Sequence, residues 1–396
     1  MNQSTIPANK RVAIIDCADY RQELLYKSLE KAAEFAGGLD VRGKTVLLKP
    51  NIVYDSSPEK AIVTHPLFLE AVIRLVKDGG AKRILVGDSP GLQQPGFIAK
   101  SSGLGETARR NGAEWVDFTQ NKTEIACPDG KMIKHFTVTG AVLEADCIIS
   151  LPKLKTHQLL HFTGAMKNLF GLIPSVLKSA MHVRLPNRDA FACMLVDLNF
   201  ALMADYAFMD AVVGMEGPGP GSGTPRKIGL VLASSNLLAI DIAACEIIGY
   251  PPARIPVCRE ALSRGIWLKD ISEIEYPAIK PKDVAMPDFQ KIPFKSAGNQ
   301  LAEMIFPRFF RKLRERLTPQ PAINPAVCIR CGNCTRICGS SAMSLSGEGK
   351  EQHVAIDYQV CIRCYCCHEI CPVKAIDIVK PSLWARVMPR RAAGPA

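Results

Sequence analysis

Cysteine is the residue type whose spacing points most directly to chemistry in this chain of 396 residues. The chain has 15 cysteines, and nine of them lie between residues 328 and 371. The segments CIRCGNCTRICG, from Cys328, and CIRCYCCHEICP, from Cys361, share the CxxCxxCxxxC spacing that is typical of ligands to cubane iron–sulfur clusters. Three thiolates at this spacing can surround one cubane, whereas the fourth lies beyond a turn and points away. We therefore predict two 4Fe-4S clusters.

The fourth cysteine of each segment is expected to bind the cluster of the other segment. The two predicted ligand sets are Cys328, Cys331, Cys334 and Cys371 for one cluster, and Cys361, Cys364, Cys367 and Cys338 for the other. Structural zinc is the alternative, but zinc sites usually take cysteines as CxxC pairs and not as CxxCxxC triplets. Because the two segments also share residues outside the cysteines, among them the CIRC start of each copy, we expect a pseudo-symmetric pair of sites.

Two positions depart from the usual cluster motif. Gly339 stands where the second copy has Pro372, a change that loosens the turn without removing a ligand. Cys366 is a ninth cysteine, and its position out of register favours a spare thiol over an oxidation-sensitive neighbour of the second cluster. Since all predicted ligands are cysteines, no iron is left open for substrate, and the expected role of the clusters is electron transfer.

The elements that precede the cysteines have the pattern of an α/β fold. Between residues 11 and 285, apolar runs of strand length alternate with segments of helical period, which predicts a mostly parallel sheet with helices on both faces. A small C-terminal α+β dicluster ferredoxin domain would follow. Strands are expected near residues 12, 45, 83, 147, 208 and 228, helices from residues 21, 67 and 237, and a hairpin around Pro128-Asp129-Gly130.

Polar side chains gather where these strands end, which is where open α/β sheets bind ligands. The segment 151–174 is the richest of them, and its lysines, histidines and asparagine suit a carboxylate or a phosphate. Glu216 is expected in a glycine-rich loop. That loop is neither a P-loop nor a GxGxxG turn, so nucleotide binding by either route is unsupported. The residues at these strand ends are Lys49, Asn51, Asp88, Lys153, Lys155, His157, His161, Lys167, Asn168 and Glu216.

Several of these segments together resemble a known family, the domain of unknown function 362, which is often fused to a dicluster ferredoxin. The resemblance covers residues 11–265, with the ferredoxin repeat at 325–380. It implies an iron–sulfur protein with a redox role and no particular reaction. The matching motifs are KPNIV followed by THP, GDSPG, LPKLKTH, TGAMKNLFGLIP, MEGPGPGSG and AIDIAA. By motif match the positions to test are Lys49, Asn51, Asp88, Lys153, Lys155, His157, Lys167, Asn168, Glu216 and Asp241.

The predicted domain boundaries place a linker between the two folded parts. We expect an α/β domain at residues 11–285, a linker at 286–320, a ferredoxin domain at 321–382 and a flexible basic tail at 383–396. Within the linker, residues 307–317 fit a basic amphipathic helix that starts at a proline. An interdomain helix is favoured for this segment over one that lies on a membrane surface.

Composition excludes several classes of protein. With 47% hydrophobic and 22% charged residues, the chain is not largely disordered. The net charge of +11 is spread along the chain and accompanies no nucleic-acid motif, so nucleic-acid binding is not expected. No apolar run is long enough to cross a bilayer, and no signal peptide is visible, so we expect a cytoplasmic protein without a transmembrane segment.

Two functional hypotheses fit these features. The first is an oxidoreductase whose α/β domain binds a small anionic substrate or cofactor while the clusters relay electrons. The second is a non-catalytic electron carrier, or an assembly protein, whose large domain docks partners. A redox partner protein is expected in both.

Overall fold

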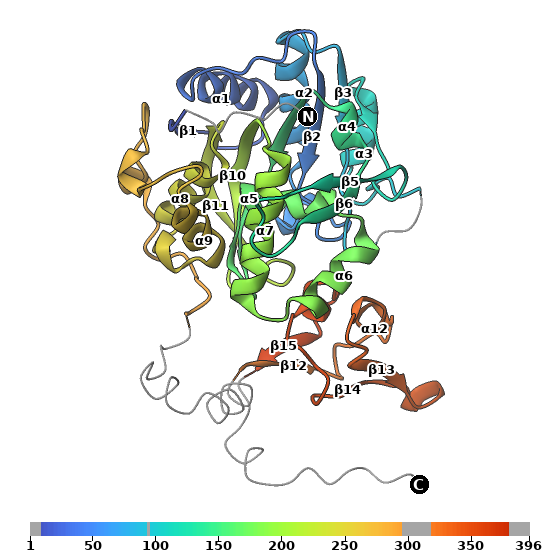
Figure 1. Ribbon diagram of the computed structural model, residues 1–396. Helices are drawn as coiled ribbons and strands as arrows, with labels where there is room; N and C mark the ends of the chain where they lie inside the picture. Colours follow the sequence, from blue (N-terminus) through green and yellow to red (C-terminus); the bar gives the residue numbers. More distant parts are fainter. Residues whose placement is uncertain (1–8, 93–95, 295–317, 380–396) are drawn as a thin grey trace. The chain divides into compact units, whose positions relative to one another are not determined.

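The computed structural model describes residues 9–92, 96–294 and 318–379. The chain divides into two compact units, Met1–Ile292 and Pro293–Ala396 (Figure 1). The predicted helix at residues 307–317 and the predicted tail at 383–396 lie outside the described residues.

The first unit is built on one large sheet. Among the described residues it has nine strands, and the main path runs β1-β11-β10-β7-β2-β3-β4, with β8 paired to β10 and to β9. The strand bounds are β1 Ala13–Asp16, β2 Thr45–Pro50, β3 Arg83–Val86, β4 Glu114–Trp115, β7 Cys147–Leu151, β8 Lys153–His157, β9 His161–Thr163, β10 Tyr206–Glu216 and β11 Thr224–Ser234.

The prediction of a mostly parallel sheet is confirmed. Neighbouring strands from β10 through β7, β2 and β3 to β4 are parallel. The β11 strand is antiparallel to both β10 and β1. Since β2, β3 and β7 run in the same direction, their C-terminal ends lie together at one edge of the sheet, with Lys49 of β2 opposite Ser150 of β7.

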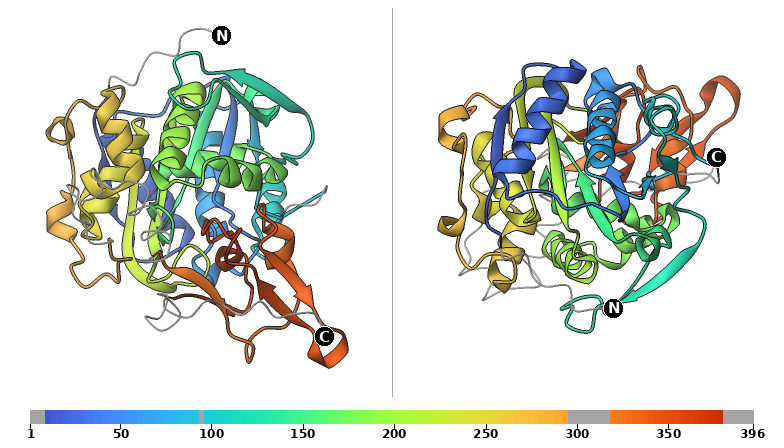
Figure 2. Two further views of the ribbon diagram at one scale, coloured as in Figure 1. Left: turned by 60° about the horizontal axis from the view of Figure 1, so that its bottom comes forward. Right: turned by 90° about the horizontal axis from the view of Figure 1, so that it is seen from above.

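Helices cover both faces of this sheet (Figure 2). Alternation along the strands explains the two layers: Val46 and Leu48 of β2 pack into the core with α1 and α2, whereas Leu47 points to the opposite face. The helices are α1 Gln22–Phe35, α2 Pro66–Asp78, α3 Leu104–Arg110, α4 Ala141–Glu144, α5 Ala165–Asn168, α6 Ser175–Arg184, α7 Arg188–Leu202, α8 Leu237–Ile247 and α9 Pro256–Arg264. Short 3₁₀ turns are η1 Pro58–Lys60, η2 Leu169–Leu172, η3 Pro252–Arg254, η4 Ile271–Glu273 and η5 Pro281–Val284.

The predicted hairpin is also confirmed. Strand β5, Lys122–Ala126, is antiparallel to β6, His135–Thr139. Its loop is fixed by the buried carboxylate of Asp197, which accepts hydrogen bonds from the backbone N–H groups of Lys131, Met132 and Ile133 at 2.7 to 2.9 Å.

The second unit consists of two copies of one strand–helix–strand pattern, and the predicted α+β ferredoxin domain is confirmed. Strand β12 pairs with β15, and β13 pairs with β14, both antiparallel. Each strand and α-helix of the first copy recurs at the corresponding place in the second. The elements are β12 Gln320–Ile323, α12 Asn333–Ile337, β13 Met343–Ser346, η6 Gly349–Glu351, β14 His353–Ile356, α13 Cys366–Glu369 and β15 Ile376–Val379.

In the part of the chain that the structure describes, no helix has both the length and the apolar character needed to cross a membrane.

Candidate functional sites

The two cysteine segments follow the same backbone path. Three positions in each segment have positive φ angles, a conformation that is uncommon for residues other than glycine. The first copy has them at Arg330 (58°), Gly332 (72°) and Ser341 (53°), and the second at Arg363 (56°), Tyr365 (65°) and Lys374 (55°). Because these positions correspond one to one when Cys328 is aligned with Cys361, the same cysteine-bearing loop is formed twice.

Four of the predicted cluster ligands line one cavity of this unit. Cys328, Cys331 and Cys334 come from the first segment, and Cys371 comes from the second. The lining also includes the apolar side chains of Ile323, Val354, Val373 and Ile376. This grouping is the one that cross-ligation of the first cluster requires.

The other four predicted ligands also lie near one another. Burial raises the pKa of the Cys361 thiol, and the neighbouring Cys364 and Cys338 thiols act in the same direction. Burial likewise raises the pKa of the Cys367 thiol well above its ordinary value, again with contributions from Cys364, Cys361 and Cys338. Three cysteines of the second segment are thus close to the last cysteine of the first.

The donor atoms at these two places fit cubane clusters. All 15 cysteines are free thiols. The fourth cysteine of each segment accepts a backbone hydrogen bond, from Ala342 N–H to Cys338 Sγ at 3.2 Å and from Ala375 N–H to Cys371 Sγ at 3.1 Å. Such N–H groups stabilise thiolate sulfur and tune a bound cluster. Within the described ranges, no group of three or more His, Cys, Asp or Glu side chains is arranged to hold a single metal ion. The cysteines of a cubane site need not be arranged in that way, because they are spread around the four irons of the cluster.

Cys366 is buried at the start of α13. A hydrogen bond to Cys364, together with burial, raises the pKa of the Cys366 thiol well above its ordinary value. The same hydrogen bond lowers the pKa of Cys364. In this geometry Cys366 is a protonated donor to a predicted ligand, consistent with a position outside the motif.

Four of the strand-end candidates form one buried network in the first unit. The ammonium group of Lys49, at the end of β2, lies 3.0 Å from Asp88 Oδ1 and donates to Asn168 Oδ1 at 2.9 Å. Asn51 Nδ2 donates to the same Asn168 oxygen at 2.9 Å. Asn168 Nδ2 in turn donates to the Lys49 carbonyl at 2.9 Å. Only glycine fits at Gly171, because a Cβ there would collide with Asp88 and Lys49.

Lys153 belongs to a separate buried network. Its ammonium group lies 2.8 Å from Asp210 Oδ2 and 2.8 Å from the hydroxyl of Tyr20. The Tyr20 hydroxyl donates to Asp210 Oδ1 at 2.8 Å, and the His65 N–H donates to Asp210 Oδ2 at 3.0 Å. The charge of Lys153 is therefore compensated by residues that the sequence did not single out.

The other two candidates on β8, Lys155 and His157, contact backbone groups. Lys155 Nζ donates to the Ile62 carbonyl at 2.6 Å. His157 Nδ1 accepts from the N–H groups of Leu159 and Leu160 at 3.1 and 3.3 Å, so this ring nitrogen carries no proton. Burial lowers the pKa of His157 well below its ordinary value, and Lys167 is the strongest of the positive groups that add to the effect.

The two remaining acidic candidates anchor backbone segments. Glu216 is the last residue of β10, where the sequence had predicted a loop, and its Oε2 accepts from the Gln290 N–H at 3.0 Å. Asp241, in α8, accepts from the N–H groups of Ala165 and Met166 at 2.5 and 3.1 Å, at the start of α5.

Sequence reasoning missed Lys178 of α6, which lies beside the Lys49 network, and His182 of the same helix. Lys178 is 9% exposed, and its ammonium group donates to the carbonyl of Ser89, the residue after Asp88. His182 lies one helical turn further on. Their spacing of four residues, directly after the GLIP segment, is a weak signal because exposed helix faces often carry such pairs.

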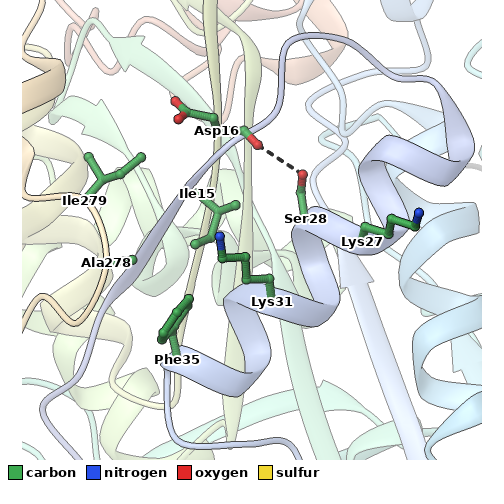
Figure 3. Close-up of a pocket in the computed structure, with 8 residues that line it drawn as sticks. All are labelled: Ile15, Asp16, Lys27, Ser28, Lys31, Phe35, Ala278 and Ile279. Carbon is green, nitrogen blue, oxygen red and sulfur yellow. Dashed lines mark hydrogen bonds between the residues drawn. The ribbon is translucent and has the colours of Figure 1, made fainter.

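A larger cavity, of about 460 Å³, lies between α1 and the segment that contains Ala278 and Ile279 (Figure 3). Its wall is fixed by a 3.0 Å hydrogen bond from Ser28 Oγ to the Asp16 carbonyl. Lys27 and Lys31 line it, and none of the strand-end candidates does.

Comparison with known proteins places the chain in a family. Residues 46–246 match the family described as "Domain of unknown function (DUF362)", and residues 327–375 match the "4Fe-4S dicluster domain". The chain belongs to the DUF362 family. Its C-terminal match makes it an iron–sulfur protein, as its cysteines predicted.

One curated relative of this DUF362 protein is the "Thylakoid-associated protein sll1697" of Synechocystis sp., which is 30% identical over 289 residues. The alignment covers 72% of the DUF362 protein and 88% of the relative. Among solved structures, the lactate racemase apoprotein from Thermoanaerobacterium thermosaccharolyticum has a TM-score of 0.39 at 16% identity, with 64% of this chain and 59% of that chain covered. A protein from Thermotoga maritima has a TM-score of 0.35 at 14% identity, with 63% and 60% covered.

Replacement of Asp210 by alanine tests whether Lys153 is held by this carboxylate. The substitution leaves a buried ammonium group without its counter-charge, so the free energy of unfolding should fall by roughly 3–5 kcal/mol. Asp189→Ala is the control, because it breaks an exposed ion pair with Arg259 and should cost less than about 1 kcal/mol. Urea unfolding followed by circular dichroism measures both, and equal losses would contradict the assignment.

The buried carboxyl group of Asp241 leads to a second prediction, on how the stability of the protein depends on pH. Burial raises the pKa of Asp241 to about 7, so the folded protein holds a proton that the unfolded chain releases near pH 4. The resulting stability is complete below about pH 4 and is lost as the pH rises through about 7.

Asp241→Asn cannot ionise, and its melting temperature should therefore rise relative to that of the wild type between about pH 5 and about pH 8. Differential scanning calorimetry across this range measures the difference. A difference that stays constant with pH would show that Asp241 titrates normally.

Proposed function

We propose that this DUF362 protein is an iron–sulfur oxidoreductase. Two 4Fe-4S clusters in its C-terminal domain relay electrons, and its α/β domain binds a small anionic substrate or cofactor at the strand ends. The observation that carries the proposal is the grouping of Cys328, Cys331, Cys334 and Cys371 around one cavity, with Cys338 beside the second triplet.

The cysteine geometry supports a relay and not a site of substrate chemistry at iron. When bound, 4Fe-4S clusters accept and donate single electrons. Four cysteine ligands per cluster leave no coordination position for a substrate. The apolar side chains packed around Cys334, Cys367 and Cys371 keep water from the sulfur atoms. The N–H groups of Ala342 and Ala375 donate to the sulfur atoms of Cys338 and Cys371 and stabilise their charge.

The α/β domain supports the anionic ligand through its buried positive groups. Lys49 and Lys155 lie close to the C-terminal ends of strands β2 and β8, which is the position at which open α/β sheets bind ligands. His157, the last residue of β8, adds an imidazole that is uncharged because burial lowers its pKa well below the ordinary value. Buried ammonium groups attract carboxylates and phosphates strongly because the surroundings screen charge poorly.

A redox partner protein would supply or remove the electrons. We place this exchange in the cytoplasm, where thiols stay reduced, in line with the free state of the cysteines. The name of the Synechocystis relative refers to thylakoids. A purely docking role is the alternative, and it would be favoured if the protein copurified with a redox complex and bound no small molecule.

Removal of Cys338 tests the cross-ligated pair of clusters. The wild-type protein, purified without oxygen, should contain about eight iron atoms per chain, and Cys338→Ala should lose about four of them because the second cluster lacks one ligand. Cys366→Ala is the matched control, since this thiol lies in the same motif but outside the ligand set, and it should keep all the iron. Iron analysis with electron paramagnetic resonance of the reduced protein measures both.

The opposite pattern, with iron lost from Cys366→Ala and retained in Cys338→Ala, would overturn the ligand assignment. Zinc in place of iron in the wild type would overturn the redox function itself.

A further inference from the structure

Positive charge accumulates beside the Lys49 network. Lys178 and His182 project from α6 toward the same ring: Lys178 Nζ lies 5.7 Å from the centre of Phe170, and the rings of Phe170 and His182 lie 6.1 Å apart. The positive charge of Lys167 acts on Lys178, on His182 and on Lys49. These side chains therefore surround one small region.

Asp88 is the one acid that acts on Lys178 among the described residues. Its carboxylate already has three partners: Oδ1 pairs with Lys49 at 3.0 Å and accepts from the Ser89 N–H at 2.7 Å, and Oδ2 accepts from the Ile52 N–H at 2.5 Å. One negative charge thus faces the ammonium groups of both Lys49 and Lys178. A buried excess of positive charge is costly unless an anion neutralises it.

A hydrogen-bond donor at the same place lacks an acceptor. The Ser89 hydroxyl is completely buried and has no hydrogen-bond partner among the described residues. It belongs to the residue whose carbonyl group accepts from Lys178. Buried hydroxyl groups are almost always paired, so an unpaired donor next to a buried ammonium group indicates the position of an absent acceptor.

We propose that Lys178 and Ser89 form a binding site for a small doubly charged oxyanion of the phosphate type. The site lies beside Lys49 and Asp88, and it rests on the proposed function in that it would hold the charged group of the anionic ligand. The Lys178 ammonium group supplies the counter-charge, and the Ser89 hydroxyl supplies a directional bond to one oxygen. The nearby charge of Lys167 adds to the positive potential and so favours a dianion over a monoanion.

The acid–base properties of the region agree with this geometry. Burial lowers the pKa of Lys178 to about 7, with Asp88 opposing the effect and Lys49 and Lys167 adding to it. An anion at the site would favour the charged form, so binding would take up a proton. The affinity for a dianion should consequently weaken as the pH rises above about 7.

The test measures anion binding by the full-length, anaerobically purified protein. Inorganic phosphate and sulfate are the dianionic probes, with acetate and chloride as monoanions at matched ionic strength. Isothermal titration calorimetry should show phosphate and sulfate binding to the wild type, and acetate and chloride should bind at least about tenfold more weakly. Equal affinity for all four would indicate nonspecific attraction and overturn the proposal.

Lys178→Met keeps most of the length of the side chain and removes its charge. Its affinity for phosphate should fall by at least about tenfold, because a charge-assisted hydrogen bond is lost. The melting temperature without phosphate should stay the same or rise, because an uncompensated buried charge is removed. Lys31→Met, at an exposed lysine of α1, is the matched control and should bind phosphate like the wild type.

Ser89→Ala keeps the test decisive should Lys178→Met fail to fold. It removes a hydroxyl group without a partner among the described residues, so stability should be kept while phosphate affinity falls several-fold. Wild-type phosphate affinity in either variant, or no phosphate binding by the wild type, would overturn the proposal. Either result would leave the electron relay untouched, because the iron content of the cysteine variants tests that function separately.

Discussion

A charge buried in a protein must be neutralised, and this constraint governs how the strand ends of the α/β domain are built. Two buried lysines are neutralised by carboxylates of the same chain: Lys49 pairs with Asp88, and Lys153 pairs with Asp210. In both pairs the carboxylate also accepts a hydrogen bond from a backbone N–H group, that of Ile52 for Asp88 and that of His65 for Asp210. Lys178 lies next to the first pair and shares its single acid. We therefore assign the contact with the anion to Lys178, while Lys49 adds its positive charge to the same region.

The ferredoxin domain must also stabilise buried charge, and it uses the same loop twice to do so. A cubane brings several negatively charged sulfur ligands into an apolar environment, and backbone N–H groups are the available donors. The loop that presents Cys338 and the N–H of Ala342 recurs in the second copy, where it presents Cys371 and the N–H of Ala375. Positive φ angles at Arg330 and Arg363 show that even the strained positions are repeated. One loop design thus serves both predicted sites.

The sequence predicted the positions of the strands and helices better than it predicted how neighbouring strands pair. Apolar runs located β2, β3, β7, β10 and β11, and the glycine pairs ended α1 and α2 close to where the structure ends them. Strand direction was not predictable for β1, because a strand buried on both faces has the same pattern whether its neighbour is parallel or antiparallel. The cysteine spacing, in contrast, predicted the dicluster domain directly, since ligand chemistry restricts it tightly.

The candidate site in the α/β domain was predictable only in part, because the sequence shows where strands end but not which distant residues contact them. Lys49, Asn51 and Asp88 meet because parallel strands end at one edge, a rule that the sequence alone could apply. The separation of Lys153 from them depends on Tyr20 and Asp210, which come from distant parts of the chain and carry no local signal. Glu216 ends a strand and not a loop because β10 extends to pair with Thr224 of β11. Lys178 was missed because its helical spacing resembles that of a solvated surface.

A crystal structure of the anaerobic protein grown with selenate tests the central claim most directly. Data at the selenium edge should show an anomalous peak within hydrogen-bonding distance of Lys178 Nζ and Ser89 Oγ. Data at the iron edge from the same crystals report whether the clusters are loaded. No selenium peak beside Lys178 in crystals with both clusters loaded would contradict the claim that this buried charge exists to bind an anion.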